Sequence, residues 1–351
     1  MRDEGSHNSA LIVYPLSFIL RGACDLATAT ITFVAMAAVI VLAGAFLASV
    51  TDRIAELTGM GQTIAGLVLL AVATSLPELT IGWNAVRIGA PDLMAGNVLG
   101  ASLMNLLILA VLDLVTRTRS RAFSRSAAAH ALSATASVLM TSVVLLALLL
   151  DWKWTLWRVG PGSAMILLAY LFSLRLIYFD EKSARERLDE PRREGLSLRL
   201  AVAGYLVAAT AIFLAAPQLS RSAEQLAEST GLGDSFFGTV FVALVTTLPE
   251  AVTTLAAIRL GRIDMAVGNI FGSNAFNMVI LLVADFATPG ALLSQVSKSH
   301  AVTAVAVIFV TAVATLSLLY RAEKRWWIIE PDAALVILLV LGAMYLVYVV
   351  S

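Results

Sequence analysis

Two glutamates stand in the middle of long apolar segments, each directly after a proline. Glu78 follows Thr-Ser-Leu-Pro and Glu250 follows Thr-Thr-Leu-Pro, in segments 62–86 and 234–258. An unpaired carboxylate at mid-membrane depth costs several kcal/mol, so such groups usually face a cavity and mark an ion path. Neither neighbourhood offers a lysine or arginine partner. We therefore expect a bound cation, or protons, to supply the compensating charge.

The prolines are expected to break their helices and to free backbone oxygens beside the glutamates. Proline has no N–H and clashes with the carbonyl four residues back, here that of Ala73 or Val245. The preceding turn should hold carbonyls without helical partners, which is tolerated at this depth where the backbone lines a cavity. The candidate carbonyls are those of Ala71, Thr74, Ala243 and Thr246.

The side chains near the glutamates are rich in oxygen, which is the ligand that hard cations prefer. Calcium takes about six to eight oxygens, whereas magnesium requires a tighter octahedron and retains its waters. No thiolate or imidazole cluster is present for softer metals. We predict a site for transported Ca²⁺ and for Na⁺ or H⁺, without a resident cofactor. Its side-chain oxygens would come from Thr74, Ser75, Thr246, Thr247, Asn105 and Asn277.

Both glutamate segments belong to an internal repeat with a constant offset of 172 residues. Residues 59–108 align without gaps on 231–280, with 18 of 50 positions identical, including Pro-Glu, Gly-Asn and a further Asn in one register. Inverted repeats in transporters place the substrate near the bilayer midplane, on interrupted helices. A channel tends instead to build rings of like groups from several subunits. The repeat therefore favours a transporter.

The composition places most of the chain in a membrane. Of the 351 residues, 59% are hydrophobic and 14% are charged, against about 25% charged in a soluble protein. We predict an all-α integral membrane protein of ten transmembrane helices, in two inverted five-helix repeats with the second and seventh helices broken. Segments with the about 20 apolar residues that a spanning helix needs are 28–50, 62–86, 92–115, 127–150, 156–178, 199–219, 234–258, 264–286, 300–320 and 328–350.

One polar stretch divides the chain into two halves. The first repeat would occupy residues 1–178, with the apolar run 11–20 as an interfacial lead-in. The second would occupy 199–351, joined to the first by a linker over 179–198. Most lysines and arginines fall on the linker's face, which predicts a cell-membrane protein with a cytoplasmic linker and both termini outside. The expected partners are transported cations and the lipid bilayer. The zero net charge indicates no nucleic acid, and no obligatory protein partner is evident.

The remaining polar and small residues of the repeat are interpreted as structural. Aspartates at helix starts are usually N-caps, small residues four apart let helices approach, and asparagines join helices through hydrogen bonds. Asp113 and Asp285 are expected at the membrane interfaces. The other residues in this group are Asp92 and Asp264, Gly96 and Gly100, Gly268 and Gly272, and Asn97 and Asn269.

These motifs resemble the two signature repeats of the calcium/cation antiporter superfamily, in particular the sodium/calcium exchangers. Thr74–Glu78 and Thr246–Glu250 are similar to the family's G-T-S-L-P-E signature, and 96–105 and 268–277 to its G-N-x-x-G-S-N-x-x-N/D signature. The resemblance implies alternating access with four cation positions around two glutamates. Calcium would be bound by Glu78, Glu250 and the carbonyls of Thr74 and Thr246.

The resemblance also implies the sodium positions. These would use the carbonyls of Ala71 and Ala243 and the hydroxyls of Ser75, Thr247 and Ser273, with Asn105 and Asn277 at the centre.

Five positions depart from the family pattern. The glycine before Thr-Ser is Ala73 or Val245, Ala101 replaces a serine at one implied sodium position, and Ser102 replaces an asparagine. Asn277 stands where many members carry Asp. The missing hydroxyl at Ala101 leaves both sodium and protons open as counter-ions.

Two other functions were weighed against calcium exchange. One is exchange of potassium, magnesium or manganese. The other is an intramembrane enzyme, which would require a nucleophile and a base or a metal-activated water. His130 and His300 lie near segment ends without Ser or Cys motifs, so we expect no enzyme.

Overall fold

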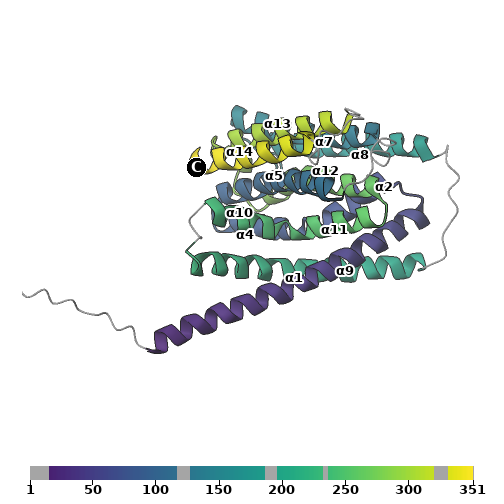
Figure 1. The fold of residues 1–351 in the computed structure, drawn as a ribbon. Helices are drawn as coiled ribbons and strands as arrows, with labels where there is room; N and C mark the ends of the chain where they lie inside the picture. Colours follow the sequence, from purple (N-terminus) through teal and green to yellow (C-terminus); the bar gives the residue numbers. More distant parts are fainter. Residues whose placement is uncertain (1–15, 117–126, 186–195, 232–235, 320–330, 351) are drawn as a thin grey trace, which may run out of the picture.

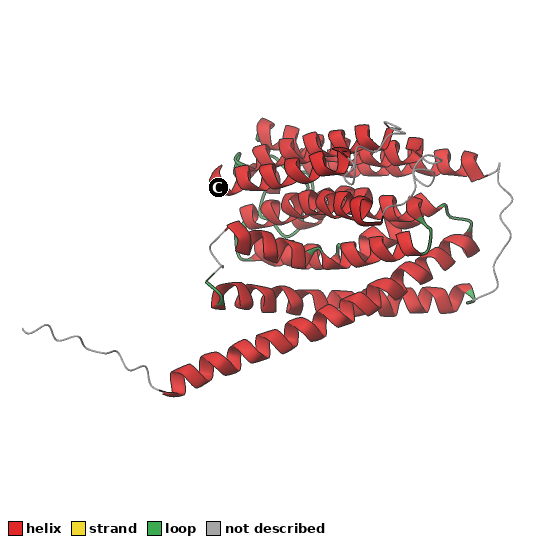
Figure 2. Cartoon of the chain, viewed as in Figure 1, coloured by secondary structure: helices red, strands yellow, loops and turns green. Residues whose placement is uncertain are grey.

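The computed structural model describes residues 16–116, 127–185, 196–231, 236–319 and 331–350. Within these ranges every named element is a helix (Figure 2). This confirms the all-helical class, and it follows from the apolar composition, because backbone groups in lipid must find their partners inside the segment.

The helices of the two halves follow the same order. The first half contains α1 (Leu16–Thr58), α2 (Gln62–Ile64), η1 (Ala65–Leu70), α3 (Ala71–Thr74), α4 (Leu76–Arg87), α5 (Pro91–Thr116), α7 (Ala127–Leu150) and α8 (Pro161–Arg185). The second contains α9 (Leu198–Ser229), α10 (Phe236–Thr246), α11 (Leu248–Arg259), α12 (Ile263–Asp285), η2 (Leu292–Ser294), α13 (His300–Leu319) and α14 (Pro331–Val350).

Seven described helices are long and apolar enough to cross a membrane, and two bent pairs pass the same test together. The bent pairs fall on the two glutamate segments, with bends of 47° between α3 and α4 and 56° between α10 and α11. The predicted span 328–350 corresponds to α14, whose apolar part Ala333–Val349 is shorter. Its first residues, 328–330, lie outside the described ranges.

Several predicted boundaries were wrong. Helix α1 begins at Leu16, so the end of the expected lead-in is continuous with the first span, and α9 continues to Ser229. Helix α8 starts at Pro161 and ends at Arg185, so residues 179–185 of the expected linker are helical. Residues 186–195 of the linker and residues 1–15 lie outside the described ranges. The side of the membrane on which the linker lies stays a prediction.

The bundle has three layers when viewed from the side (Figure 1). Helices α1 and α9 cross along one side, and α7, α8, α13 and α14 lie on the other. The broken helices lie between them together with α5 and α12, of whose spans 78% and 89% are buried. The two helices that carry the asparagines of the repeat are therefore the most enclosed spans.

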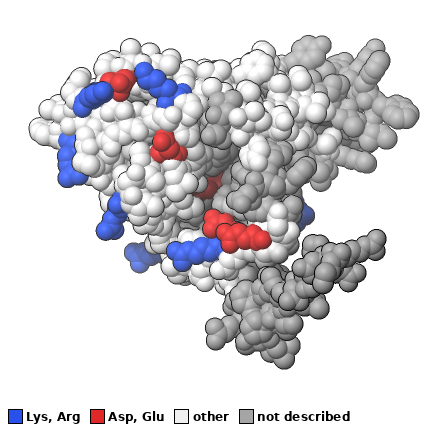
Figure 3. Space-filling view, turned by 90° about the vertical axis from the view of Figure 1, so that its left-hand side faces the viewer, with Lys and Arg blue, Asp and Glu red and all other residues white. Residues whose placement is uncertain are grey.

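The end of the bundle at which α1 begins carries acidic and basic side chains in small groups (Figure 3). Uncharged surface separates these groups, and the described part of this face carries no continuous patch of side chains of one charge. This agrees with the formal net charge of zero.

The two broken helices differ in conformation although their sequences are related. Residues 65–70 form a π-helix, whereas the equivalent residues 237–242 lie within the α-helix α10. A π-helix bonds i to i+5, is rare, and occurs mostly as single turns at functional sites. The related halves therefore hold two different states of one segment.

A candidate cation site between the two broken helices

Each glutamate lies in the first turn of the helix that follows a break. Ser75 and Thr247 are the N-cap residues of α4 and α11, with φ and ψ of −90° and 7°, and −89° and 12°. The proline follows in the first turn, where its missing N–H removes no helical bond. Glu78 and Glu250 come next, at the helix end whose dipole favours negative charge. The Leu-Pro-Glu order therefore restarts a helix with its carboxylate at the start.

The carbonyls before the breaks are only partly free, and one part of the sequence expectation was wrong. The Ala71 carbonyl accepts the Ser75 N–H at 3.0 Å, and the Ala243 carbonyl accepts the Thr247 N–H at 3.3 Å. Both therefore keep helical partners. For the Thr74 and Thr246 carbonyls, no hydrogen bond between the described elements is found.

The two glutamates are buried and close enough to interact electrostatically. Their exposed fractions are 2% for Glu78 and 1% for Glu250. Neither forms an ion pair with any lysine, arginine or histidine of the described chain, and the Oε2 atom of each has no donor. Two buried acids without cationic partners are an incomplete arrangement that a cation would complete.

Hydroxyl groups connect the two halves at the breaks. Ser75 Oγ donates to Glu250 Oε1 at 3.4 Å, and Thr74 Oγ1 lies 3.5 Å from Ser273 Oγ. The hydroxyls of Thr246 and Thr247 instead donate to the Ala243 carbonyl, at 2.9 and 3.0 Å. The Thr74 hydroxyl also donates to the Leu70 and Ala71 carbonyls, at 3.1 and 3.4 Å. The equivalent hydroxyls that differ between the halves are therefore those of Ser75 and Thr247.

Backbone carbonyls determine how the two central amides are oriented. The Val98 carbonyl can only accept, so Asn277 must present its Nδ2 there, at 3.4 Å. Asn274 Nδ2 donates to the Ser102 carbonyl at 3.2 Å, which turns Asn274 Oδ1 toward Asn105 Nδ2 at 3.0 Å. The Oδ1 atoms of Asn105 and Asn277 are left buried without a donor. In each of these two amides, the nitrogen is used by a hydrogen bond and the buried oxygen Oδ1 is the atom left to accept one.

Sequence reasoning missed two residues of this network. In the sequence, Asn274 is notable only as a match to the family pattern, and Ser102 only as a departure from it. In the structure Asn274 orients Asn105, and Ser102 Oγ lies 3.4 Å from Asn277 Nδ2 while donating to the Val98 carbonyl at 2.8 Å. Their position in the second motif of the repeat was the available indication.

The flanking asparagines join the neighbouring helices, as expected. Asn97 Nδ2 donates to the Glu78 carbonyl at 3.5 Å. Asn269 Nδ2 donates to the hydroxyls of Thr253 and Thr254 at 3.0 and 2.9 Å. They therefore hold α4 to α5 and α11 to α12, and Asn269 Oδ1 is left buried without a donor among the described residues.

The aspartates near the helix ends differ from the predictions. The N-cap of α12 is Arg262, and Asp264 in its first turn lies 2.8 Å from His130 Nε2. Asp92 Oδ1 accepts the Ser297 N–H at 2.6 Å and lies 3.5 Å from His300 Nε2. Each aspartate thus meets the histidine of the other half.

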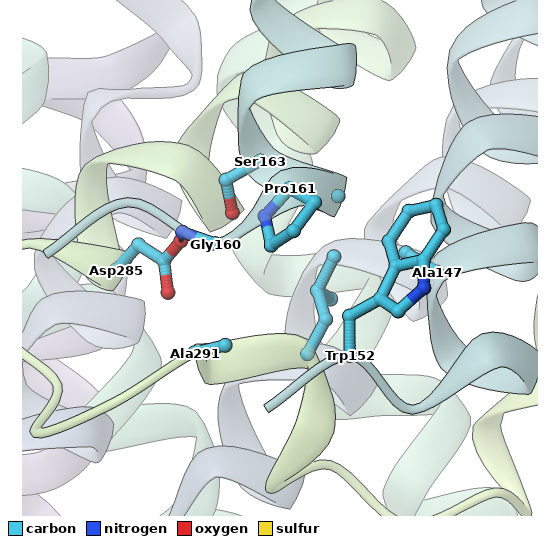
Figure 4. Close-up of a pocket in the computed structure, with 9 residues that line it drawn as sticks. Ala147, Trp152, Gly160, Pro161, Ser163, Asp285 and Ala291 are labelled. Carbon is cyan, nitrogen blue, oxygen red and sulfur yellow. Dashed lines mark hydrogen bonds between the residues drawn. The ribbon is translucent and has the colours of Figure 1, made fainter. Parts of the chain in front are cut away.

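Asp285 is fully buried within the protein at the end of α12. It lies beside Gly160 (Figure 4) and accepts the Gly160 N–H at 2.7 Å. It also accepts the Leu292 N–H at 2.6 Å. It therefore joins the loop before α8 to the loop after α12, and both of its oxygens are used. Asp113 is half-buried.

Glycines bring α12 into backbone contact with the first broken helix. A Cβ on Gly272 would lie 2.5 Å from Leu67 Cα, and one on Gly268 would lie 2.5 Å from the Thr63 carbonyl oxygen. At Gly100, the equivalent of Gly272, no described atom lies within 4 Å of such a Cβ. The predicted close packing thus holds for the pair on α12, where only glycine fits.

Gly272→Ala is expected to destabilise the protein by about 1–3 kcal/mol, because the added methyl group meets backbone that cannot move aside cheaply. Thermal unfolding in detergent should show a melting temperature several degrees lower. Gly100→Ala is the matched control and should leave it nearly unchanged. Equal melting temperatures for both variants would contradict the crossing described here.

Among the predicted ligands, Ser75 contacts Glu250 and Thr74 lies next to Ser273 across the two halves. Among the described residues no group of three or more acidic, histidine or cysteine side chains could hold a metal. The predicted ligands with oxygens for which no donor is found among the described residues are Glu78, Glu250, Asn105, Asn277, Thr74 and Thr246.

Known proteins share this architecture. The Escherichia coli (strain K12) inner membrane protein YrbG is 29% identical over 240 residues, covering 66% of this chain and 71% of its own length. The putative antiporter CaxA of Alkalimonas amylolytica is 26% identical over 316 residues, covering 85% and 91%. A solved structure of the sodium-calcium exchanger NCX_Mj covers 91% of this chain and 99% of that chain, with a TM-score of 0.66 and 18% identity. That likeness shows the fold.

A family match covers both halves of the chain. Residues 28–179 and 200–351 each match the family described as sodium/calcium exchanger protein. The two ranges are separated by the same 172 residues as the repeat. This multi-pass membrane protein therefore belongs to the sodium/calcium exchanger protein family.

Proposed function

We propose that this protein is a secondary active antiporter that exchanges calcium for sodium or protons by alternating access. The observation that carries the proposal is the set of four acceptor oxygens without described donors. They are the Oε2 atoms of Glu78 and Glu250 and the Oδ1 atoms of Asn105 and Asn277. Buried acceptors are normally satisfied, and a bound cation would supply the partner that these four oxygens lack.

Charge and ligand number favour calcium among the alternatives. Two ionised glutamates balance one divalent cation. Four side-chain oxygens and the Thr74 and Thr246 carbonyls make six, within the about six to eight that calcium takes. The asparagines add oxygen without charge, so the site favours a divalent ion over potassium. Mg²⁺ and Mn²⁺ are the alternatives that competition experiments would address.

The proposed architecture is ten spans in two inverted halves, 1–178 and 199–351, with a cytoplasmic linker and both termini outside. The difference between the two broken helices supports alternating access. One contains a π-helical turn and bends by 47°, and the other is α-helical and bends by 56°. In inverted-repeat transporters one repeat rocks against the other around a fixed site, so we infer that the halves exchange these conformations.

The counter-ion is the finer part of the proposal. The sodium positions would involve the hydroxyls of Ser75, Thr247 and Ser273. They would also use the second lone pairs of the Ala71 and Ala243 carbonyls, which already accept one helical N–H each. Ser273 Oγ lies 3.5 Å from Thr74 Oγ1, whereas its equivalent Ala101 has no hydroxyl. One sodium position is therefore poorer in oxygen, and protons remain a counter-ion that two glutamates accept.

Ala101→Ser is expected to increase the dependence of calcium uptake on an outward sodium gradient, because it restores an oxygen ligand for that position. Calcium-45 uptake at clamped pH, measured against the sodium gradient, provides the readout. Ser273→Ala is the reciprocal variant and should reduce the same dependence. An unchanged sodium response in both variants would argue against occupied sodium positions here.

Reconstitution in proteoliposomes tests the proposal as a whole. Calcium-45 uptake should be driven by an outward sodium gradient at clamped pH, or by a proton gradient without sodium. Unlabelled Mg²⁺, Mn²⁺ and K⁺ should compete poorly. Calcium uptake that depends on neither the sodium gradient nor the proton gradient would rule out antiport. Stronger competition by another cation than by unlabelled calcium would assign a different substrate.

A further inference from the structure

One hydrogen bond joins α9 to the π-helical turn of the first broken helix, apart from the bond of Gln62 Nε2, at the start of that helix, to Asp52 Oδ1 on α1 at 2.8 Å. Tyr205, on α9, donates its hydroxyl to the Leu69 carbonyl at 2.9 Å. Leu69 lies in the π-helical turn η1, two residues before Ala71. Tyr205 is half-buried. The bond therefore connects the α1–α9 layer to the conformation of the segment that leads into the site.

The same contact exists in the second half, but without a hydroxyl. At the constant offset of 172, Tyr205 corresponds to Phe33 on α1, and Leu69 corresponds to Phe241 on α10. The Phe33 and Phe241 rings stack with centroids 6.2 Å apart and an interplanar angle of 27°. Phenylalanine has no O–H to donate, so only the first half carries a side-chain hydrogen bond at this position.

The bond and the π-helix occur in the same half. Residues 65–70 are π-helical where Tyr205 binds, and residues 237–242 are α-helical where Phe33 packs. If the two halves exchange conformations during transport, the second half has no hydroxyl to hold the corresponding turn. The hydrogen bond then stabilises only one of the two access states.

We propose that Tyr205 is a positioning residue that holds the first broken helix in its π-helical form and thereby biases the transporter toward the state described here. This inference rests on the proposed alternating-access function. A hydrogen bond of this kind changes an equilibrium by about two- to tenfold. Apparent affinity falls with the fraction of molecules in the competent state, so a bias raises the apparent KM at one membrane face and lowers it at the other.

Two single substitutions at equivalent positions test the bias. Tyr205→Phe removes the hydroxyl that favours the present state, and Phe33→Tyr offers one to the opposite state. Both should therefore move the ratio of the apparent calcium KM values at the two faces in the same direction, by about two- to tenfold. The double variant should move it further. The measurement uses inside-out and right-side-out membrane vesicles.

Tyr170→Phe is the matched control, because Tyr170 on α8 is also half-buried and no hydrogen bond is found for it in the described chain. It should leave the KM ratio unchanged. A general structural defect would lower uptake from both faces without changing the ratio. A ratio unaffected by Tyr205→Phe, or moved in opposite directions by the two substitutions, would overturn the proposal.

Amide hydrogen exchange gives a readout that does not depend on transport. Tyr205→Phe should accelerate exchange over residues 65–74 relative to wild type, and Tyr170→Phe should not. Unchanged exchange would refute the positioning role. If the wild type transports no calcium while Tyr205→Phe accelerates exchange, the antiport function fails and the positioning contact stands.

Discussion

Glu250→Gln is expected to reduce calcium uptake by at least about a thousandfold. The substitution keeps the shape of the side chain and removes one of the two charges that would balance the ion. A carboxylate bound to a divalent ion at about 2.4 Å contributes several kcal/mol even at an effective dielectric constant of about 20. Glu78→Gln should have an effect of the same order, because the two residues are equivalent in the repeat. Initial rates of calcium-45 uptake in proteoliposomes provide the measurement.

Glu224→Gln is the matched control for this pair. Glu224 is exposed on α9, so the same loss of charge should leave uptake within about twofold, as surface changes usually have small effects. Size-exclusion profiles of all three variants should match that of the wild type. Wild-type uptake by either Glu78→Gln or Glu250→Gln would remove that residue from the site.

Asn277→Leu is expected to weaken calcium binding by about ten- to a hundredfold. The substitution keeps a similar volume but removes the Oδ1 acceptor, and interactions of a polar group with a charge contribute about 1.5–3 kcal/mol, or one to two factors of ten. It also removes the donor to the Val98 carbonyl. The apparent KM for calcium should therefore rise more than the maximal rate falls.

Asn277→Asp separates these two losses. The aspartate retains an oxygen for the ion, but it can donate to the Val98 carbonyl only when protonated. We therefore expect uptake to persist and to depend more steeply on pH than in the wild type. Equal KM values for the leucine variant and the wild type would show that Asn277 is not a ligand.

The sequence was most informative where chemistry and repetition coincided. The Pro-Glu pairs and the offset of 172 predicted where both helices break, and the structure has its breaks next to Ser75 and Thr247. A proline and a buried acid are local signals whose consequences do not depend on distant packing. The family match over both halves confirms the recognition, whereas the ligand assignments stay predictions.

The direction of individual polar groups was beyond sequence reasoning. The orientation of Asn105 depends on Asn274, which depends on the Ser102 carbonyl, and no local pattern encodes such a chain of partners. The Ala71 and Ala243 carbonyls were expected to be free, but the helix continues one residue further and binds them. Whether these carbonyls accept a helical N–H depends on the backbone angles of Ser75 and Thr247 at the break, which the residue types do not specify.

Contacts between the halves were also unpredictable from residue types alone. Asp264 was interpreted as an N-cap and His130 as an isolated segment end, yet the two lie 2.8 Å apart. Nothing in the sequence distinguishes Tyr205, because a tyrosine in an apolar span is ordinary in a membrane protein. Its significance emerges only when its hydroxyl is compared with the phenylalanine at the equivalent position.

Direct calcium binding to the purified protein tests the central claim most directly. Isothermal titration in detergent, without sodium and at fixed pH, should show one calcium bound per chain in the wild type and in Glu224→Gln. The double variant Glu78→Gln/Glu250→Gln should show no binding in the same concentration range while remaining folded. Binding of calcium to that double variant with wild-type affinity would contradict the account.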